Sequence, residues 1–239
     1  MIIQGEYITM TDQLEPRILY LSDSDNPDFD ERRKLINIAC VGDSITGWNN
    51  IRFEMLGPSG VGQEIYPTYP EFLQELAKKR FFVVDCGIAG AISREGLVYV
   101  KNALQKFPNA RYFVLGFGTN DLAEGYPIES VSNNILNNYS IMIDNVLKNS
   151  KQPVLFNVSQ LNSTAFNERF VEDGRKKIKY YNQRLEEYCK SRNIPLADIY
   201  PVLKDEHFAD AIHPNEEGAR LIAQEVYKTI NLVEDRVFN

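Results

Sequence analysis

The stretch that decides the fold is Ile36–Gly47, which reads INIACVGDSITG. Its first half is a short apolar run with β-branched residues, and this pattern predicts a buried strand. Its second half, Gly42-Asp43-Ser44, is small and polar, as expected where a strand passes into a loop. Ligands of α/β sheets bind at the carboxyl ends of the strands, so Ser44 is expected at the functional edge of the sheet.

Taken alone, the Gly42-Asp43-Ser44 triplet also fits an ordinary turn, in which aspartate or serine caps a following helix. It is not the Gly-x-Ser-x-Gly nucleophile elbow, because Thr46 stands where that motif has its second glycine. A serine nucleophile needs an activating base, an acid that orients the base, and donors for a developing oxyanion. The rest of the chain therefore decides between a turn and a catalytic serine.

Four more apolar runs follow along the chain, and segments with helical periodicity separate them. The pattern predicts strands at 81–86, 112–117, 153–158 and 195–199, and helices at 71–80, 93–106, 128–148, 174–192 and from 216 onward. Ser93 is expected to cap the second of these helices. Nearly continuous apolar strands that alternate with helices predict an α/β fold with a five-stranded parallel sheet and helices on both faces. Right-handed crossovers would bring the loops that follow the strands to one edge. These loops begin at Ser44, Gly87, Gly118 and Val158.

Length, charge and cysteine content set outer limits on the function. With 239 residues, the chain fits one large domain of ordinary globular composition. Its net charge of −7 argues against a general binder of nucleic acids or of anionic membranes. No apolar run is long enough to span a bilayer, and Met1–Asp12 lacks the pattern of a signal peptide. Cys40, Cys86 and Cys189 are odd in number and far apart, which indicates free thiols in a reducing compartment, the cytoplasm.

Two segments lie outside the regular pattern. Residues 1–33 are expected to form an N-terminal extension, and residues 34–239 a single domain. The extension could cover a sheet edge or contact a second copy of the chain, so a homo-oligomer is one expectation. The connection 48–70 is rich in glycine and proline, and long connections of this kind are usually functional or mobile. Its aromatic residues Trp48, Tyr66 and Tyr69 are candidates for lining a substrate pocket over Ser44, and they would equally serve to pack the loop onto the body.

The chain contains two histidines, His207 and His213, and the second lies in Asp210-Ala211-Ile212-His213-Pro214. A carboxylate three residues before an imidazole can hydrogen-bond one ring nitrogen and leave the other nitrogen free as a base. A loop ion pair or a capping arrangement explains the same local pattern. Asn215 is expected to cap the last helix, and His207 is expected only to pack or to be solvated in its loop.

Candidate oxyanion donors occur after two other predicted strands. Gly87–Gly90 offers backbone N–H groups that a substrate can approach closely, because glycine has no side chain. Asn120, in Gly118-Thr119-Asn120-Asp121, offers a side-chain amide. Each segment would also suit a plain turn. Their occurrence together with Ser44 and the Asp-x-x-His motif, all at strand ends or at the last helix entry, favours a catalytic site.

In order and identity these motifs resemble those of the SGNH hydrolases, also called the GDSL esterase/lipase family. The matching blocks are Gly42-Asp43-Ser44, Gly87–Gly90, Gly118-Thr119-Asn120-Asp121 and Asp210–Asn215, and they span most of the chain. The second block departs from the family at Ala91, where many members carry Asp, and at Cys86, where Asn is frequent. Each block is short, but four blocks in the right order are specific.

The resemblance implies a flavodoxin-like three-layer α/β/α sandwich and a serine esterase. It implies that Ser44 is the nucleophile, that His213 is the general base and then the general acid, and that Asp210 orients His213. The N–H groups of Ser44 and Gly90 and the amide of Asn120 would form the oxyanion hole. Hydrolysis would proceed through an acyl-enzyme, and neither a metal nor an organic cofactor is implied.

The resemblance leaves the substrate and several alternatives open. A small acyl ester, an acetylated sugar, a thioester or a lysophospholipid would each suit the implied site. An acyltransferase would use the same residues, and a non-catalytic binding protein could share the fold. A phosphate-ester enzyme that uses Asp43 and a metal is less well supported, because Asp121 is the one further carboxylate near the other strand ends.

Overall fold

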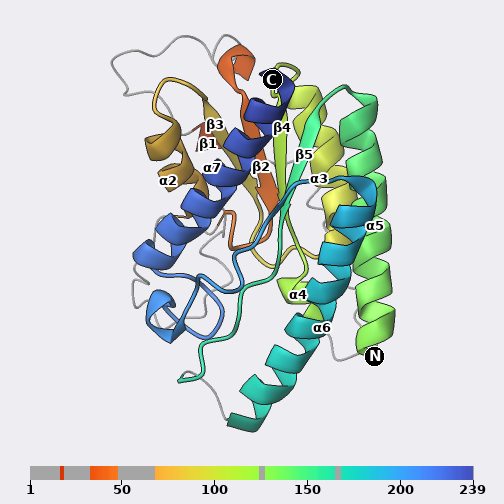
Figure 1. Cartoon of the computed structure of the whole chain (residues 1–239), viewed down its shortest axis with the longest axis vertical. Helices are drawn as coiled ribbons and strands as arrows, with labels where there is room; N and C mark the ends of the chain where they lie inside the picture. Colours follow the sequence, from red (N-terminus) through yellow and green to blue (C-terminus); the bar gives the residue numbers. More distant parts are fainter. Residues whose placement is uncertain (1–16, 19–32, 48–67, 124–126, 165–167, 239) are drawn as a thin grey trace, which may run out of the picture.

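The computed structural model describes residues 17–18, 33–47, 68–123, 127–164 and 168–238. These residues form one sheet between two layers of helices (Figure 1). The strands are β1 (Arg17–Ile18), β2 (Ile38–Gly42), β3 (Val83–Gly87), β4 (Tyr112–Gly116), β5 (Gln152–Phe156) and β6 (Leu196–Ala197). The α-helices are α2 (Tyr69–Ala77), α3 (Ser93–Lys106), α4 (Thr119–Ala123), α5 (Ile128–Lys148), α6 (Glu168–Arg192) and α7 (Glu216–Phe238). Two 3-10 helices, η3 (Arg33–Leu35) and η6 (Asp205–His207), complete the set.

Five strands run parallel in the order β3-β2-β4-β5-β6, which is the strand order of flavodoxin-like folds. The predicted five-stranded parallel sheet is therefore confirmed. Strand β1 adds a sixth, antiparallel strand beside β3, so Arg17 and Ile18 of the predicted extension belong to the sheet. The boundary at residue 33 and the single domain over 34–239 stay predictions.

The strands are buried because helices cover both faces of the sheet. Along β2, Ala39 and Val41 pack into the core formed with α3, α5 and α6, whereas Ile38 and Cys40 pack into the core formed with α2 and α7. Figure 1 shows these two groups of helices on opposite sides of the strands. This alternation explains why the strands read as continuous apolar runs rather than as alternating ones.

The carboxyl ends of the central strands lie level with one another, which positions the loops that follow. Gly42 at the end of β2 pairs with Gly87 of β3 on one side and with Gly116 of β4 on the other. A Cβ at Gly87 would lie 2.1 Å from the Gly47 backbone nitrogen. Glycine at this position therefore lets the turn that carries Ser44 lie directly against the end of β3.

Element boundaries differ from the predictions where tertiary contacts decide them. Helix α6 begins six residues before the predicted start, and β6 contains two residues rather than five. Ser93 is the first residue of α3 and not its cap, because its N–H and hydroxyl both donate to the Asp121 carboxylate, at 2.9 and 2.6 Å. The predicted cap of α7 is confirmed, since the Asn215 Oδ1 accepts a hydrogen bond from the Gly218 N–H at 3.0 Å.

Candidate active site

Ser44 lies in a tight turn directly after β2. The Asp43 carbonyl accepts hydrogen bonds from the N–H groups of Thr46 and Gly47, both at 3.0 Å. The Asp43 carboxylate accepts another from the Ile45 N–H at 2.9 Å. Ser44 itself is 7% exposed. The turn therefore holds the serine hydroxyl at the carboxyl edge of the sheet and shields most of it from water.

His213 approaches Ser44 from the loop that precedes α7. Its Nε2 lies 3.0 Å from the Ser44 Oγ, and its Nδ1 lies 2.7 Å from the Asp210 Oδ2. An ionised carboxylate only accepts hydrogen bonds, so the proton of a neutral His213 ring lies on Nδ1 and Nε2 can accept the Ser44 hydroxyl. The structure thus brings together the three residues predicted as nucleophile, base and orienting acid, although 169 positions separate Ser44 from His213.

Hydrogen bonds within its own turn keep Asp210 ionised. Its Oδ1 accepts the N–H groups of Ile212 and His213 at 2.9 and 2.8 Å. Partial burial acts to raise the pKa of the Asp210 carboxyl, but the bonds from the His213 ring, the His213 N–H and the Ile212 N–H outweigh it and lower the pKa to about 2. A carboxylate of this kind holds the imidazole in one orientation and stabilises an imidazolium when one forms.

Two of the predicted oxyanion donors lie beyond the neighbouring strands: Gly90 in the loop after β3, and Asn120 in the short helix α4 that follows β4. Gly90 is exposed and has φ +78°, a conformation that suits glycine. Apart from its two chain neighbours, no described residue has an atom within 4 Å of the position that a Cβ would occupy. The Asn120 Nδ2 donates to the Ala91 carbonyl at 2.9 Å. An amide nitrogen carries two hydrogens, so this bond uses one of the two donors of Asn120. The arrangement fixes the Asn120 side chain beside the Gly90 loop.

A second set of bonds joins α4 to the start of α3, beside the same two segments. The Asp121 carboxylate binds Ser93 at the start of α3, and the Asn138 Nδ2 donates to the Ser93 Oγ at 2.9 Å. Helices α3, α4 and α5 are therefore linked around the Gly90 and Asn120 segments. These bonds hold the two segments that carry the predicted donors in one arrangement.

Of the three aromatic residues predicted to line a substrate pocket, Tyr69 is the one whose position the structure describes. Trp48 and Tyr66 lie outside the described residues. Tyr69 is fully buried at the start of α2, and its ring packs edge-to-face against Phe156 with centroids 5.3 Å apart. The structure therefore places Tyr69 in the core between α2 and the sheet, where it packs the chain after the loop onto the body instead of lining a substrate surface.

The second histidine, His207, is packed within its own loop, as predicted. His207 is 8% exposed, and its Nδ1 accepts a hydrogen bond from the Lys204 N–H at 3.0 Å.

Over the described part of the chain, no group of three or more His, Cys, Asp or Glu side chains could hold a metal ion. None of the described helices is long and apolar enough to cross a membrane.

Asp43 is a buried carboxyl whose ionisation is altered in a way that the sequence motif does not reveal. Complete burial raises the pKa of its carboxyl to about 7; the Ile45 N–H opposes this shift, and the negative charge of Asp121 adds to it. In the unfolded chain, an aspartate has a pKa of about 3.9. The folded protein therefore holds a proton on Asp43 between about pH 4 and pH 7, whereas the unfolded chain releases it.

Replacement of Asp43 by asparagine is expected to remove part of the pH dependence of stability. Because the folded state binds the extra proton, the free energy of unfolding of the wild type should fall as pH rises from about 4 to about 7, by a few kcal/mol, and then level off. Asparagine can accept the Ile45 N–H without ever ionising, so the variant should gain stability relative to wild type over this range. Urea denaturation at several pH values measures the difference. An exposed control, Asp173→Asn, should follow the wild type, and a constant offset between Asp43→Asn and wild type would contradict the account.

A serine, a histidine and an aspartate joined by hydrogen bonds at the carboxyl edge of a parallel sheet have the geometry by which serine hydrolases are recognised. The fold and the site thus define a class, the three-layer α/β/α proteins that carry a hydrogen-bonded Ser-His-Asp triad at the carboxyl edge of the sheet. The chain belongs to the GDSL-like lipase/acylhydrolase family, whose model matches residues 40–221, and it is therefore an ester-hydrolysing enzyme. The family resemblance found in the sequence is confirmed.

Solved structures support the fold. A GDSL-like lipase from Bacteroides thetaiotaomicron is 22% identical, with a TM-score of 0.62 over 85% of this chain and 90% of that chain. A carbohydrate acetylesterase from Sinorhizobium meliloti is 14% identical, with a TM-score of 0.65 over 83% and 99% of the two chains. A catalytic mutant of an acetylxylan esterase from Geobacillus stearothermophilus is 17% identical, with a TM-score of 0.59 over 82% and 96%. Comparison with curated protein sequences gives no significant match.

Proposed function

We propose that this enzyme hydrolyses a small acyl ester by forming an acyl-enzyme on Ser44. The observation that carries the proposal is the continuous chain of hydrogen bonds from the Ser44 Oγ through His213 to Asp210, with heavy-atom separations of 3.0 and 2.7 Å. These separations lie within the range needed for proton transfer between a nucleophile and its base. Asp210 stays ionised at neutral pH because its pKa is lowered, which supports its role in orienting His213.

In the proposed first step, the Ser44 Oγ forms a bond to the acyl carbon while its proton passes to the His213 Nε2. The negative charge on the former carbonyl oxygen is stabilised by the N–H groups of Ser44 and Gly90 and by the amide of Asn120. The carbon–oxygen bond to the alcohol then breaks, and His213 returns the proton to that leaving oxygen. In the second step, a water oxygen forms a bond to the acyl carbon while its proton passes to the His213 Nε2. The bond between the acyl carbon and the Ser44 Oγ then breaks, and His213 returns the proton to Oγ, which releases the acid and restores the serine hydroxyl.

We propose a short acyl group, with an acetylated sugar as the leading substrate, and a thioester as a further candidate. The names of two structural neighbours, the acetylxylan esterase and the carbohydrate acetylesterase, support acetyl groups on carbohydrate. The connection that follows Ser44 also contains Trp48, Phe53 and Tyr66, and aromatic side chains commonly pack against sugar rings.

Acyl-chain preference tests this substrate class. With p-nitrophenyl acetate, butyrate and octanoate, kcat/KM is expected to fall at least about tenfold from acetate to octanoate, because a pocket for an acetyl group discriminates by a few kcal/mol. The enzyme should also release acetate from acetylated xylo-oligosaccharides. A preference that rises with chain length would contradict a short-acyl site. An added alcohol acceptor distinguishes an acyltransferase from an esterase. In a pure esterase the rate of hydrolysis would stay unchanged, whereas a transferase would pass the acyl group to the added alcohol.

We propose a reducing, cytoplasmic location for the enzyme. Cys40, Cys86 and Cys189 are all free and buried. Burial raises the pKa of the Cys189 thiol to about 12, so this thiol stays protonated and inert at neutral pH. The predicted homo-oligomer and the predicted lack of nucleic-acid partners stay predictions.

A further inference from the structure

The turn that carries Asp210 and His213 is held mainly by bonds within itself. Among the described residues, the Asp210 carboxylate accepts its hydrogen bonds from its own turn, from the N–H groups of Ile212 and His213 and from the His213 ring. The Ala209 N–H donates to the His213 carbonyl at 2.8 Å, which closes the same turn. The Asp210 side chain is 52% exposed. Such a turn can keep its internal shape and still shift as a unit relative to Ser44.

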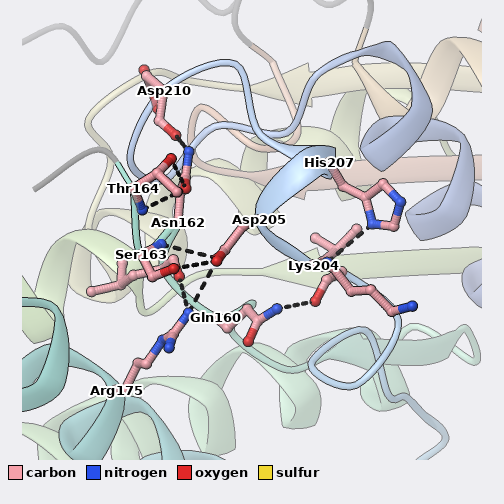
Figure 2. A network of polar contacts seen from close by, with 11 residues as sticks. Gln160, Asn162, Ser163, Thr164, Arg175, Lys204, Asp205, His207 and Asp210 are labelled. Carbon is pink, nitrogen blue, oxygen red and sulfur yellow. Dashed lines mark hydrogen bonds and ion pairs between the residues drawn. The ribbon is translucent and has the colours of Figure 1, made fainter.

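Asn162, in the loop after β5, anchors this turn to the body of the protein. Its backbone N–H donates to the Ala211 carbonyl at 3.0 Å, and its Nδ2 donates to the Asp210 carbonyl at 3.0 Å. These two bonds tie the turn to the loop after β5, and the Ser44–His213 bond links it to the end of β2. Asn162 thus anchors the turn from the loop after β5, and Figure 2 shows its amide directed toward Asp210.

The Asn162 side chain is itself held in one orientation. It is 7% exposed, and its Oδ1 accepts the Thr164 N–H at 3.0 Å and the Thr164 hydroxyl at 2.8 Å. These bonds assign oxygen to the Thr164 side of the amide and leave its nitrogen to face Asp210. A buried amide with partners on both sides is rigid, because leaving either side unpaired costs free energy.

The neighbouring residues brace the loop that carries Asn162. The Ser163 N–H and hydroxyl both donate to the Asp205 carboxylate, the former at 2.9 Å. One Arg175 nitrogen, Nη2, bridges the Asp205 carboxylate at 3.2 Å and the Leu161 carbonyl at 2.9 Å. Figure 2 shows these side chains converging between the loop after β5 and the segment around η6. The loop on both sides of Asn162 is therefore tied to the segment that leads into the Asp210 turn.

We propose that Asn162 is a positioning residue, which holds the Asp210 main chain so that the His213 Nε2 stays within reach of the Ser44 Oγ. This inference rests on the proposed function, because it concerns the geometry of the same proton transfer. A displacement of about 1 Å at reacting groups lowers rates on the order of a hundredfold. Its bonds go to the main chain of Asp210 and Ala211, so it acts on His213 through this turn.

Asn157 offers a matched control at the same end of β5. It is 6% exposed, and its Nδ2 donates to the Asp198 carboxylate at 2.6 Å. Its Oδ1 accepts the N–H groups of Ile199 and Tyr200 at 2.9 and 3.1 Å. Asn157 thus makes the same kinds of bonds as Asn162, but toward β6 and not toward the Asp210 turn. Its replacement costs stability without touching the proposed anchor.

The test compares Asn162→Ala, Asn162→Asp and Asn157→Ala with the wild type. With p-nitrophenyl acetate, Asn162→Ala should lower kcat about 10- to 100-fold with KM changed less than about threefold, and should slow fluorophosphonate labelling of Ser44 to a similar extent. Asn162→Asp keeps the oxygen that accepts from Thr164 but replaces the N–H donor to the Asp210 carbonyl with an oxygen. It should therefore lower kcat as much as Asn162→Ala does. Asn157→Ala should keep kcat within about twofold of wild type at a comparable loss of Tm.

Two outcomes would overturn the inference. Equal loss of kcat in Asn162→Ala and Asn157→Ala, or labelling at the wild-type rate in Asn162→Ala, would show that Asn162 only stabilises the fold. Should Asn162→Ala fail to fold, Asn162→Asp decides, because it retains the side-chain volume and the bond to Thr164. Failure of the proposed function looks different, because the wild type itself would then neither hydrolyse the ester nor become labelled at Ser44.

Discussion

Replacement of Ser44 by alanine is expected to lower kcat for ester hydrolysis by at least about 10⁴-fold while leaving the fold intact. The Ser44 Oγ is the one atom of this residue that bonds to His213, at 3.0 Å, so its removal deletes the attacking atom and little else. Alanine fits the space because it is smaller than serine and has no special backbone demand. Steady-state rates on p-nitrophenyl acetate, together with thermal unfolding, measure both parts of the expectation.

Ser159 provides the matched control for this replacement. It is 7% exposed, as Ser44 is, and it lies three residues beyond β5 at the same edge of the sheet. Ser159→Ala should therefore keep kcat within about twofold of wild type. Retention of more than about 1% of wild-type activity in Ser44→Ala would mean that another group is the nucleophile.

Replacement of His213 by alanine is expected to cause a loss of similar size. Without the imidazole, no group accepts the Ser44 proton in the first step, and no acid protonates the leaving oxygen. Residues that act as a unit are not additive, so the double variant Ser44→Ala/His213→Ala should be no slower than Ser44→Ala alone. Steady-state kinetics of both single variants and of the double variant test this expectation.

The other histidine separates a catalytic loss from a structural one. His207 is buried and accepts the Lys204 N–H, so His207→Ala should lower Tm. Its kcat should stay within about threefold of wild type, because the ring makes no bond to Ser44 or Asp210. A loss of activity in His207→Ala as large as that in His213→Ala, at equal folded fraction, would contradict the assignment of the base.

The sequence predicted most strongly those elements whose own periodicity decides their structure. The apolar stripe of residues 128–148 matches α5 residue for residue, because a single face of this helix packs against the sheet. The parallel sheet follows from the alternation of five apolar strands with helices, whereas its flavodoxin-like strand order was implied only by the family resemblance. The chemical motifs were visible because their residue types are distinctive and each lies directly after a strand or before the last helix.

Features that depend on distant partners could not be predicted in this way. Ser93 looked like a helix cap, but Asp121, 28 positions away, takes its N–H and hydroxyl. Tyr69 suited either a pocket or the core, because the sequence of a glycine- and proline-rich connection does not indicate which of its aromatic residues become buried. The structure places Tyr69 in the core. Asn162 lies in no motif, and its link to Asp210 spans 48 positions. Only the packed chain reveals such contacts.

The most direct test of the central claim is fluorophosphonate labelling of the purified protein, followed by mass spectrometry of its peptides. The account predicts one labelled residue, Ser44, with labelling abolished in Ser44→Ala, strongly slowed in His213→Ala and unchanged in Ser159→Ala. Ester turnover by a protein that carries its label on another residue, or that is never labelled at Ser44, would contradict the claim that Ser44 is the activated nucleophile.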